Sequence, residues 1–169
     1  MLAADLHLGH KNITKYRTQF SSAEEHHETI LDNIKSSVNK ADSLWLLGDI
    51  AFDKHWLSRI SEIKCRRKVL ILGNHDTDRA IKIRDLVEVY DEVHSLVSHR
   101  NIWFSHFPIH PQELRNRDFN IHGHLHGDTV KIYDSGCIDK HYINVSIEHT
   151  GFKAVSFEEV INNHKERIK

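Results

Sequence analysis

The chain has 169 residues, 39% hydrophobic and 28% charged, and its 23 Lys and Arg nearly balance 24 Asp and Glu. This length fits one full core, so we expect residues 1–169 to form a single domain without a cap domain. The balanced charge argues against a protein coated by nucleic acid, and the apolar runs are too short to span a membrane. We expect a cytoplasmic protein, because little chain precedes Asp5 for a signal peptide and Cys65 and Cys137 form no disulfide framework.

Helical and strand patterns follow one another along the chain. We expect a helix at 22–39, which opens on the capping-box pattern Ser-Ala-Glu-Glu and carries apolar residues at four-residue intervals. A second helix follows Ser156 near the C-terminus and ends in basic residues that suit the helix dipole. Short apolar runs predict buried strands at 44–47, 69–72, 102–104, 119–121 and 142–145. Uninterrupted apolar strands between helices indicate an α/β protein whose sheets are covered on their faces.

Polar side chains able to bind metal follow the apolar runs, including Leu-Ala-Ala at 2–4. They are Asp5 and His7, then Asp49, then Asn74 with His75 and Asp76, then His106, and finally His124 with His126. In α/β sheets, ligands bind beyond the carboxyl ends of the strands, so we expect these segments to meet at one edge. Residues two apart would project to the same side of an extended backbone, which would aim both members of each His pair or Asp-His pair into one cavity.

The residue types also indicate which metals would bind. Carboxylate, imidazole and amide ligands suit Mn, Fe, Zn, Ni or Mg better than a metal that prefers thiolates. The set is too large for one tetrahedral zinc ion, which takes about four ligands. We therefore predict two divalent ions that share a bridging carboxylate and keep positions open for water and substrate. His122 should face away from its neighbours His124 and His126, and we interpret it as a surface or supporting residue.

The blocks DLH, GD, GNHD, SHFP and GHLH resemble, in this order, the signature of the calcineurin-like metallophosphoesterases; they lie at 5–7, 48–49, 73–76, 105–108 and 123–126. The opening DLHLGHKNI is similar to that of small bacterial and phage members. The resemblance implies a two-sheet β-sandwich flanked by α-helices, a four-layer αββα fold, which refines the single-sheet interpretation. It also implies the ligand sets: Asp5, His7 and His126 for the first metal, Asn74, His106 and His124 for the second, and Asp49 as the bridge.

The same resemblance implies a metal-dependent phosphoesterase, a phosphatase or phosphodiesterase in which a hydroxide between the two metals attacks phosphorus in line. His75 would protonate the leaving oxygen or stabilise the transition state, and Asp76 would orient His75. His10 lies in the turn after His7, where it could touch substrate phosphate or remain a surface histidine. Arg115 and Arg117 lie between His106 and His124 in the sequence, where they could bind a second phosphate or a nucleotide.

Several alternatives remain open from the sequence. We expect a small phosphorylated or nucleotide-like substrate, with a nuclease of the same architecture as the first alternative. The second alternative is a metal-bound scaffold without catalytic activity. The presence of His75 and Asp76 argues against it, because a scaffold does not need an acid that is not a metal ligand. The basic stretch Lys64–Lys68 could contact a nucleic-acid backbone, although a solvated loop before a strand is the simpler interpretation.

Overall fold

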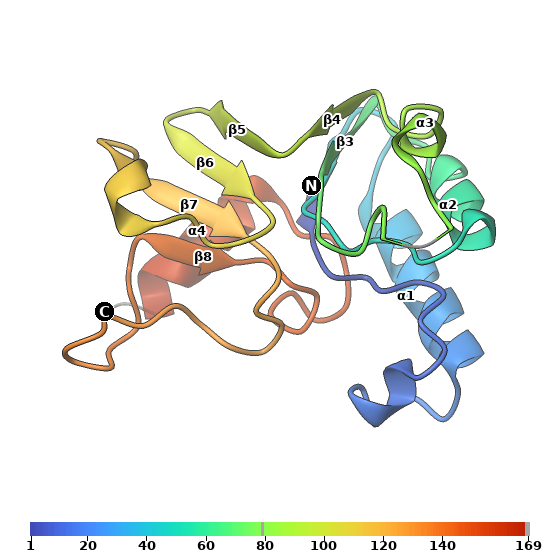
Figure 1. Cartoon of the computed structure of the whole chain (residues 1–169), viewed down its shortest axis with the longest axis horizontal. Helices are drawn as coiled ribbons and strands as arrows, with labels where there is room; N and C mark the ends of the chain where they lie inside the picture. The colour runs from blue at the N-terminus through green and yellow to red at the C-terminus, as the bar shows by residue number, and fades with distance from the viewer. Residues whose placement is uncertain (79, 168–169) are drawn as a thin grey trace.

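Two four-stranded sheets lie at the centre of the computed structural model, which describes residues 1–78 and 80–167 (Figure 1). The first sheet is parallel and consists of β1 (Leu2–Ala3), β2 (Ser43–Leu46), β3 (Arg67–Ile71) and β4 (Glu92–His94). The second consists of β5 (Leu96–His99), β6 (Ile102–Ser105), β7 (Phe119–His122) and β8 (Tyr142–Asn144). Only β5 runs antiparallel to its neighbour, and Ser95 alone separates β4 from β5 where the chain passes between the sheets.

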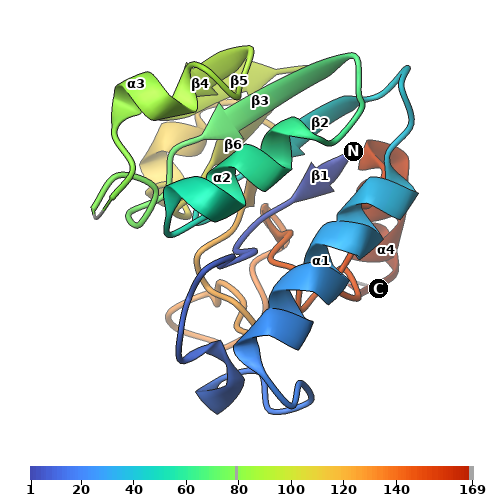
Figure 2. The ribbon, with the colours of Figure 1, turned by 90° about the vertical axis from the view of Figure 1, so that its right-hand side faces the viewer.

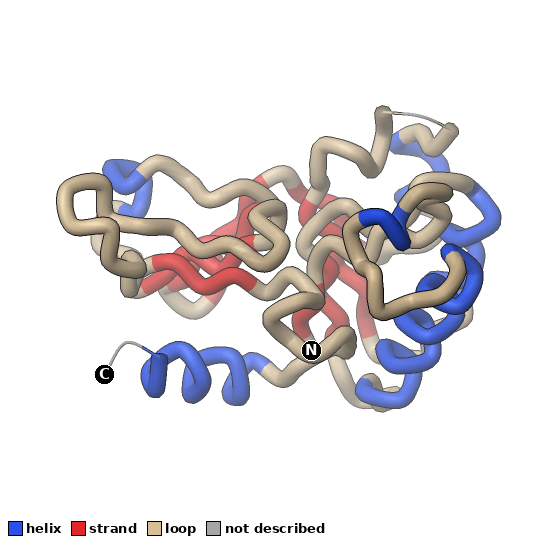
Figure 3. The backbone as a smooth tube through the Cα atoms, turned by 90° about the horizontal axis from the view of Figure 1, so that it is seen from below, coloured by secondary structure: helices blue, strands red, loops and turns tan. Residues whose placement is uncertain are grey.

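Helices cover the outer sides of the two sheets. The first sheet carries α1 (Ala23–Ser37), α2 (Lys54–Ser61) and the short α3 (Ile83–Leu86), and α4 (Phe157–Arg167) lies beside the second sheet (Figures 1 and 2). Two 3-10 turns, η1 (Ile13–Lys15) and η2 (Pro111–Leu114), lie in the loops. Figure 3 shows the strands in the middle with helices on opposite sides. The predicted α/β sandwich with flanking helices is confirmed.

The alternation of side chains along β2 explains why its sequence is apolar throughout. Leu44 and Leu46 belong to the core between the first sheet and its helices, whereas Trp45 and Leu47 pack in the core shared with the second sheet. Successive residues of a strand point to opposite faces, so a strand covered on both faces has no polar side.

The predicted elements agree with the structure to within about two residues. The capping residues act as the sequence indicates, since Ser22 Oγ accepts from the Glu25 amide at 3.1 Å and Ser156 Oγ from the Glu159 amide at 3.0 Å. Four elements were not predicted, α2, α3, β4 and β5. One of them carried a signal: the Asp53 side chain caps α2 by accepting from the Trp56 amide at 3.0 Å.

Within the described residues, every helix is too short or too polar to cross a bilayer.

Candidate metal centre

The seven predicted ligands lie just beyond the carboxyl ends of β1, β2, β3, β6 and β7, at one edge of the sandwich. Six of the seven, all except Asn74, form two groups, and within each group the ligand atoms lie within 4.8 Å of one another. The first group is Asp5, His7 and His126, and the second is Asp49, His106 and His124. Each group combines residues that follow strands of both sheets. The structure therefore brings together the residues that the sequence placed at a common edge.

The backbone that carries these ligands is not extended, which corrects one expectation. Five of the ligands have positive φ angles: Asp5 (59°), His7 (53°), Asp49 (57°), His124 (69°) and His126 (50°). Residues other than glycine rarely adopt this left-handed region, because the Cβ atom crowds the backbone. The side chains thus converge from tight turns rather than from alternating strand positions. Such conformations persist only where the surrounding structure holds them, and they concentrate at functional sites.

Two glycines allow the loops after β2 and β3 to touch. Gly48 has φ of 84°, and a Cβ atom there would overlap the ring of His106 and the backbone of Gly73. A Cβ atom on Gly73 would overlap the carboxylate of Asp49. Glycine is required at both positions because the second group of ligands fills the space that a side chain would take.

In the first group, the two oxygens of Asp5 have different surroundings. Oδ2 accepts hydrogen bonds from the His124 amide at 2.9 Å and from Ser146 Oγ at 2.7 Å. Oδ1 is buried, has no hydrogen-bond partner among the described residues, and lies 3.9 Å from His7 Nε2, which is buried and unpartnered as well. Burial raises the pKa of Asp5 to about 6. Two buried polar atoms without partners are costly, and a cation bound to both would satisfy them, so this donor set fits a metal ion.

A buried ion pair that sequence reasoning missed supports the same group. Arg17 donates from Nη2 to the Asp5 carbonyl at 2.7 Å and to Glu148 Oε1 at 2.7 Å. Glu148 Oε1 also lies 3.2 Å from His126 Nδ1, which leaves Nε2 of that ring available to a metal. Burial would raise the pKa of Glu148, but His126 and Arg17 outweigh it and hold that pKa at about 2. Carboxylates that bond to the far nitrogen of a histidine ligand commonly fix its orientation.

In the second group, His106 has a defined tautomer. Its Nδ1 lies 2.8 Å from the Leu47 carbonyl, which can only accept, so Nδ1 carries the proton. Its Nε2 then faces Asn74 Oδ1 at 3.1 Å and Asp49 Oδ2 at 3.5 Å. In the neutral ring these three atoms are all acceptors, and a shared cation, a proton or a metal ion, would satisfy them. Burial lowers the pKa of His106, but the neighbouring Asp49 carboxylate outweighs this and raises it overall.

Asp49 belongs to the second group and also approaches the first. Its Oδ2 is 4.0 Å from His7 Nε2 and 3.5 Å from His106 Nε2, while its Oδ1 accepts from the His75 amide at 2.9 Å. Burial would raise the pKa of Asp49, but the interaction with His106 lowers it to about 2, so the carboxylate is ionised. A position close to both groups is the one that a bridging ligand needs.

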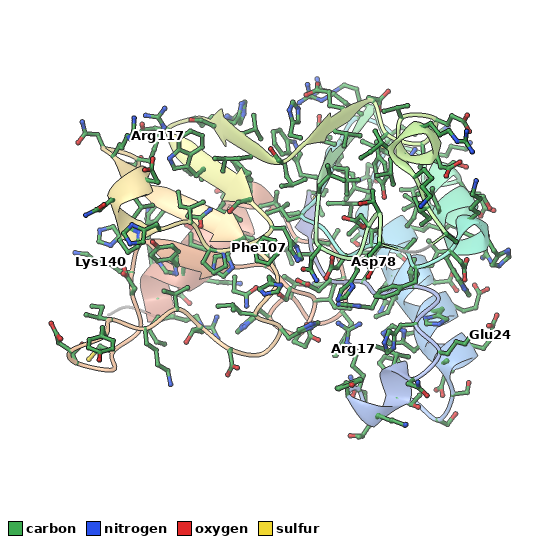
Figure 4. All side chains as sticks on the ribbon, viewed as in Figure 1. Arg17, Glu24, Asp78, Phe107, Arg117 and Lys140 are labelled. Atoms are coloured by element: carbon green, nitrogen blue, oxygen red, sulfur yellow. The ribbon has the colours of Figure 1, made fainter. Side chains whose placement is uncertain are left out.

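The structure corrects the role predicted for Asp76. Its two oxygens accept from three backbone amides, those of Asp49 at 3.1 Å, Gly73 at 2.7 Å and Ile50 at 3.0 Å. The partner of His75 is instead Asp78, whose Oδ2 lies 2.7 Å from His75 Nδ1 (Figure 4). Asp76 therefore holds the loops together, and Asp78 orients the histidine. The sequence motif GNHD contains the first carboxylate and ends before the second.

A pocket of about 570 Å³ opens beside the first group of ligands. His10 lies on its wall, and its ring centre is 6.1 Å from those of His7 and Tyr16. Tyr16 is 78% exposed. The pocket is lined by His7, His10, Ile13, Tyr16, Arg17, His75, His126, Gly127 and Glu148. The predicted location of His10 near the metal ligands agrees with this structure.

Arg115 and Arg117 do not line this pocket, which corrects their predicted role. Arg115 pairs with Glu113 at 3.1 Å on the surface. Arg117 donates from Nε to Ser98 Oγ at 2.9 Å and lies over the ring of Trp103. Figure 4 shows Arg117 well away from Phe107, whose ring packs against His124 at 4.3 Å. The loop after His106 folds back over β5 and β6, which proximity in sequence did not indicate. His122 is buried and donates from Nδ1 to the Gly123 carbonyl at 2.7 Å, outside both groups.

Comparison with known families agrees with the pattern of ligands. The family model described as calcineurin-like phosphoesterase matches residues 1–167. The chain belongs to the calcineurin-like phosphoesterase family. It is similar to the Gene 66 protein of Mycobacterium phage L5, with 33% identity over 95% of this chain and 92% of the relative. It is also similar to an uncharacterized protein of Methanocaldococcus jannaschii, with 28% identity over 95% of this chain and 88% of the relative.

Two solved structures share the fold of this chain. A protein of unknown function from Aquifex aeolicus superposes with a TM-score of 0.70 and 26% identity, covering 95% of this chain and 96% of the other. The nuclease MPE of Pseudomonas putida superposes with a TM-score of 0.50 and 20% identity, covering 81% of this chain and 65% of the other. At that identity, the likeness to the nuclease shows the fold alone.

Proposed function

We propose that this family member is a dinuclear-metal-dependent hydrolase of phosphate esters. One observation carries the proposal: ligand atoms of two Asp and His groups converge, and Asp49 Oδ2 of the second group lies within 4.0 Å of both His106 Nε2 and His7 Nε2 of the first group. Asp5, His7 and His126 would hold one divalent ion, Asn74, His106 and His124 the other, and Asp49 would bridge them. Two such ions lower the pKa of a water molecule between them and bind the phosphoryl oxygens.

The other residues of the site would orient the ligands and move one proton. The Leu47 carbonyl and Glu148 fix the rings of His106 and His126 through their Nδ1 atoms, so that Nε2 faces the centre. His75 lies at the pocket beside the first group and is held by Asp78. Its Nε2 would give a proton to the leaving oxygen, and the Asp78 carboxylate would hold the ring in position for that transfer.

The pocket supports a small phosphorylated or nucleotide-like substrate. Its volume of about 570 Å³ lies in the range of small-molecule sites. Tyr16, Ile13 and His10 offer it aromatic and apolar surface beside His75, so the leaving group would lie against them. Among the described residues that line it, Arg17 is the one Arg or Lys, and the backbone and Glu148 already occupy it. We also propose a cytoplasmic location, which the free thiols of Cys65 and Cys137 support.

A nuclease with the same site is the second candidate. It is favoured by the exposed Tyr16 ring, because nucleobases stack on aromatic side chains. It is disfavoured by the scarcity of basic side chains among the described residues of the pocket wall, since a long backbone needs several phosphate contacts.

Hydrolysis of p-nitrophenyl phosphate and bis-p-nitrophenyl phosphate tests the proposal. The protein is stripped of metal with a chelator and reloaded with Mn²⁺, Ni²⁺, Mg²⁺ or Zn²⁺, and bound metal is counted by elemental analysis. We expect metal-restored hydrolysis, and at least about a hundredfold loss of kcat in His75→Ala with unchanged metal content. Asp49→Ala should lose both activity and metal. His141→Ala removes an exposed histidine that pairs with Asp139 outside the site, and it should match the wild type.

The outcomes separate the three functions. No hydrolysis by a protein that binds two ions per chain would favour the scaffold. Faster hydrolysis of oligonucleotides than of either ester, with affinity falling steeply as salt rises, would favour the nuclease. A preference for one of the two small esters would assign the enzyme as a phosphatase or a diesterase.

A further inference from the structure

A second pocket, of about 350 Å³, lies at the opposite edge of the sandwich. It contains residues from the amino ends of β1, β2 and β3, from the turn between β5 and β6, and from the beginning of α4. Its lining is Met1, Leu2, Ala41, Asp42, Ser43, Trp45, Arg66, Arg67, His99, Arg100, Phe104 and Phe157. Figure 2 shows the beginning of β1 beside α4, where these elements meet. The metal ligands follow the other ends of the same strands.

The charged residues of this pocket are mostly basic. Arg66, Arg67 and Arg100 line it, together with a single carboxylate, Asp42. Arg67 is paired through Nη1 with Glu92 at 2.8 Å, but its Nε is buried and has no partner among the described residues. A guanidinium donor without an acceptor leaves part of the hydrogen-bonding capacity of Arg67 unused.

The other two arginines are free to turn toward a ligand. Arg66 donates from Nη2 to Ser43 Oγ at 2.9 Å, and Arg100 lies over the ring of Phe157 at 5.9 Å. In the part of the chain that the structure describes, neither forms an ion pair with a carboxylate. Arg100 and Asn101 have φ angles of 49° and 62°. Two left-handed residues in succession form the tight turn of a two-residue hairpin, which fixes Arg100 at the edge of the pocket.

Aromatic rings form the remaining wall. The ring of Trp45 lies 4.9 Å from that of Phe104 and 5.7 Å from that of His99, and the Arg67 guanidinium lies over it at 5.9 Å. Aromatic rings and planar guanidinium groups both stack on flat ring systems. A ligand that satisfies all of these groups has an anionic end for the arginines and a flat ring for the aromatic wall.

We infer that this amino-edge pocket binds a mononucleotide, with the phosphate at Arg66 and Arg100 and the base at the aromatic wall. The inference is independent of the proposed hydrolysis, because the residues lie outside the metal centre. It also gives a role to the basic stretch at 64–68, which contributes two arginines here and none to the pocket of the metal centre.

Titration followed by ¹H–¹⁵N NMR tests the inference on the full chain loaded with Zn²⁺, which is diamagnetic. The probe is the phosphonate analogue of AMP, whose P–C bond replaces the ester that a phosphoesterase could hydrolyse. We expect saturable shifts of the Trp45 indole and of the amides of Arg66, Arg67 and Arg100. Inorganic phosphate and adenosine, each supplying half of the ligand, should bind at least about tenfold more weakly.

Paired variants identify the arginines as the cause. Arg66 and Arg100 are exposed, so Arg66→Ala with Arg100→Ala should leave the fold intact. Losing two charge-assisted hydrogen bonds should raise the Kd at least about tenfold. Arg84→Ala, which removes an exposed arginine on α3, should change the Kd by less than about twofold. Shifts confined to residues around the metal ligands, an unchanged Kd in the double variant, or equally tight binding of inorganic phosphate would each overturn the inference.

Discussion

The orientation of His75 depends on a carboxylate three residues further along the chain. Asp78 Oδ2 lies 2.7 Å from His75 Nδ1, and both side chains are more than a third exposed, at 37% and 36%. Water competes for such a contact, so its value lies in fixing the ring and its tautomer more than in stabilising the fold. Asp76 is buried and accepts hydrogen bonds from three backbone amides of the loops after β2 and β3, so its main contribution is to the stability of the fold.

The contrast predicts different consequences for two neighbouring substitutions. Asp78→Ala should lower kcat for the chromogenic esters about tenfold and leave KM, metal content and the urea midpoint nearly unchanged. Asp76→Asn should lower the free energy of unfolding by about 2 kcal/mol, because the new amide turns a donor toward three backbone donors. Steady-state kinetics and urea unfolding measure the two effects. A larger loss of kcat in a folded Asp76→Asn than in Asp78→Ala would restore Asp76 as the orienting residue.

A glycine beside the bridging carboxylate should matter as much as a ligand. Gly73→Ala places a methyl group where Asp49 now lies, so Asp49 must move away from the two groups. We expect metal affinity to fall at least about tenfold, which is the cost of a displaced ligand contact. Gly127→Ala is the matched control, because a Cβ atom there meets nothing within 4 Å. Isothermal titration with Zn²⁺ measures the metal affinity of the two variants. Equal affinities would mean that the loops after β2 and β3 can move apart without a cost in free energy.

The site residues found from sequence are those whose type and order carry chemistry. Asp5, His7, Asp49 and the GHLH histidines could be identified because metal ligands follow strand ends in a fixed order. Arg17 and Glu148 could not, since a buried Arg-Glu pair has no motif and joins residues far apart in the chain. The prediction that Arg115 and Arg117 bind substrate was wrong for another reason: nearness to a ligand in the sequence says little about the direction in which a loop runs.

At the scale of elements, α1 carries two buried histidines that face the metal-bearing loop. His26 Nε2 lies 2.8 Å from Arg17 Nη1, and His27 Nε2 accepts from the Gly9 amide at 3.2 Å. Arginine and the amide can only donate, so a proton taken up at either Nε2 would break that contact. Burial lowers the pKa of His26 to about 3 and that of His27 to about 4. The helix α1 therefore supports the loop after β1 only while the rings of His26 and His27 are uncharged.

This arrangement predicts an acid-sensitive fold. The folded-state pKa values lie below the ordinary value of about 6.5, so the unfolded chain takes up protons first as pH falls. The free energy of unfolding should be highest above about pH 6.5 and should lose about 2 kcal/mol per histidine by pH 5. His27→Gln keeps an acceptor for Gly9 and should remove about half of this loss. Urea unfolding of the metal-free wild type and of metal-free His27→Gln at pH 7.5 and pH 5 tests this prediction. An equal loss of unfolding free energy in the two proteins would exclude His27 as a contributor.

The elements that sequence predicted well are those with strong local signals. Strands covered on both faces are uniformly apolar, and the capping serines mark the starts of α1 and α4. The edge strands β4 and β5 lacked such a signal, since β5 reads Leu-Val-Ser-His and is mostly exposed. Their positions depend on pairing with β3 and β6, and a local sequence pattern does not show which strands pair.

At the scale of the whole molecule, the candidate metal centre takes its residues from loops of both sheets. The first group takes Asp5 and His7 from the loop after β1 and His126 from the loop after β7. The second takes Asp49 from the loop after β2 and His106 from the loop after β6. A metal in either group would therefore cross-link the sheets at their carboxyl edge, where five ligand residues already hold left-handed conformations.

Metal should consequently stabilise both sheets together. At about a hundred times its Kd, one ion that binds only the folded state adds about 2.7 kcal/mol, so two ions would add about 5 kcal/mol to the free energy of unfolding. His7→Ala should remove about half of this gain, whereas His141→Ala should keep it. Hydrogen exchange with and without Zn²⁺ locates the effect, and amides of β1–β3 and β6–β8 should gain protection in the same titration. Protection that arose in one sheet alone would mean that the ligands of the other do not close on the metal, and the shared position of Asp49 would then be structural rather than bridging.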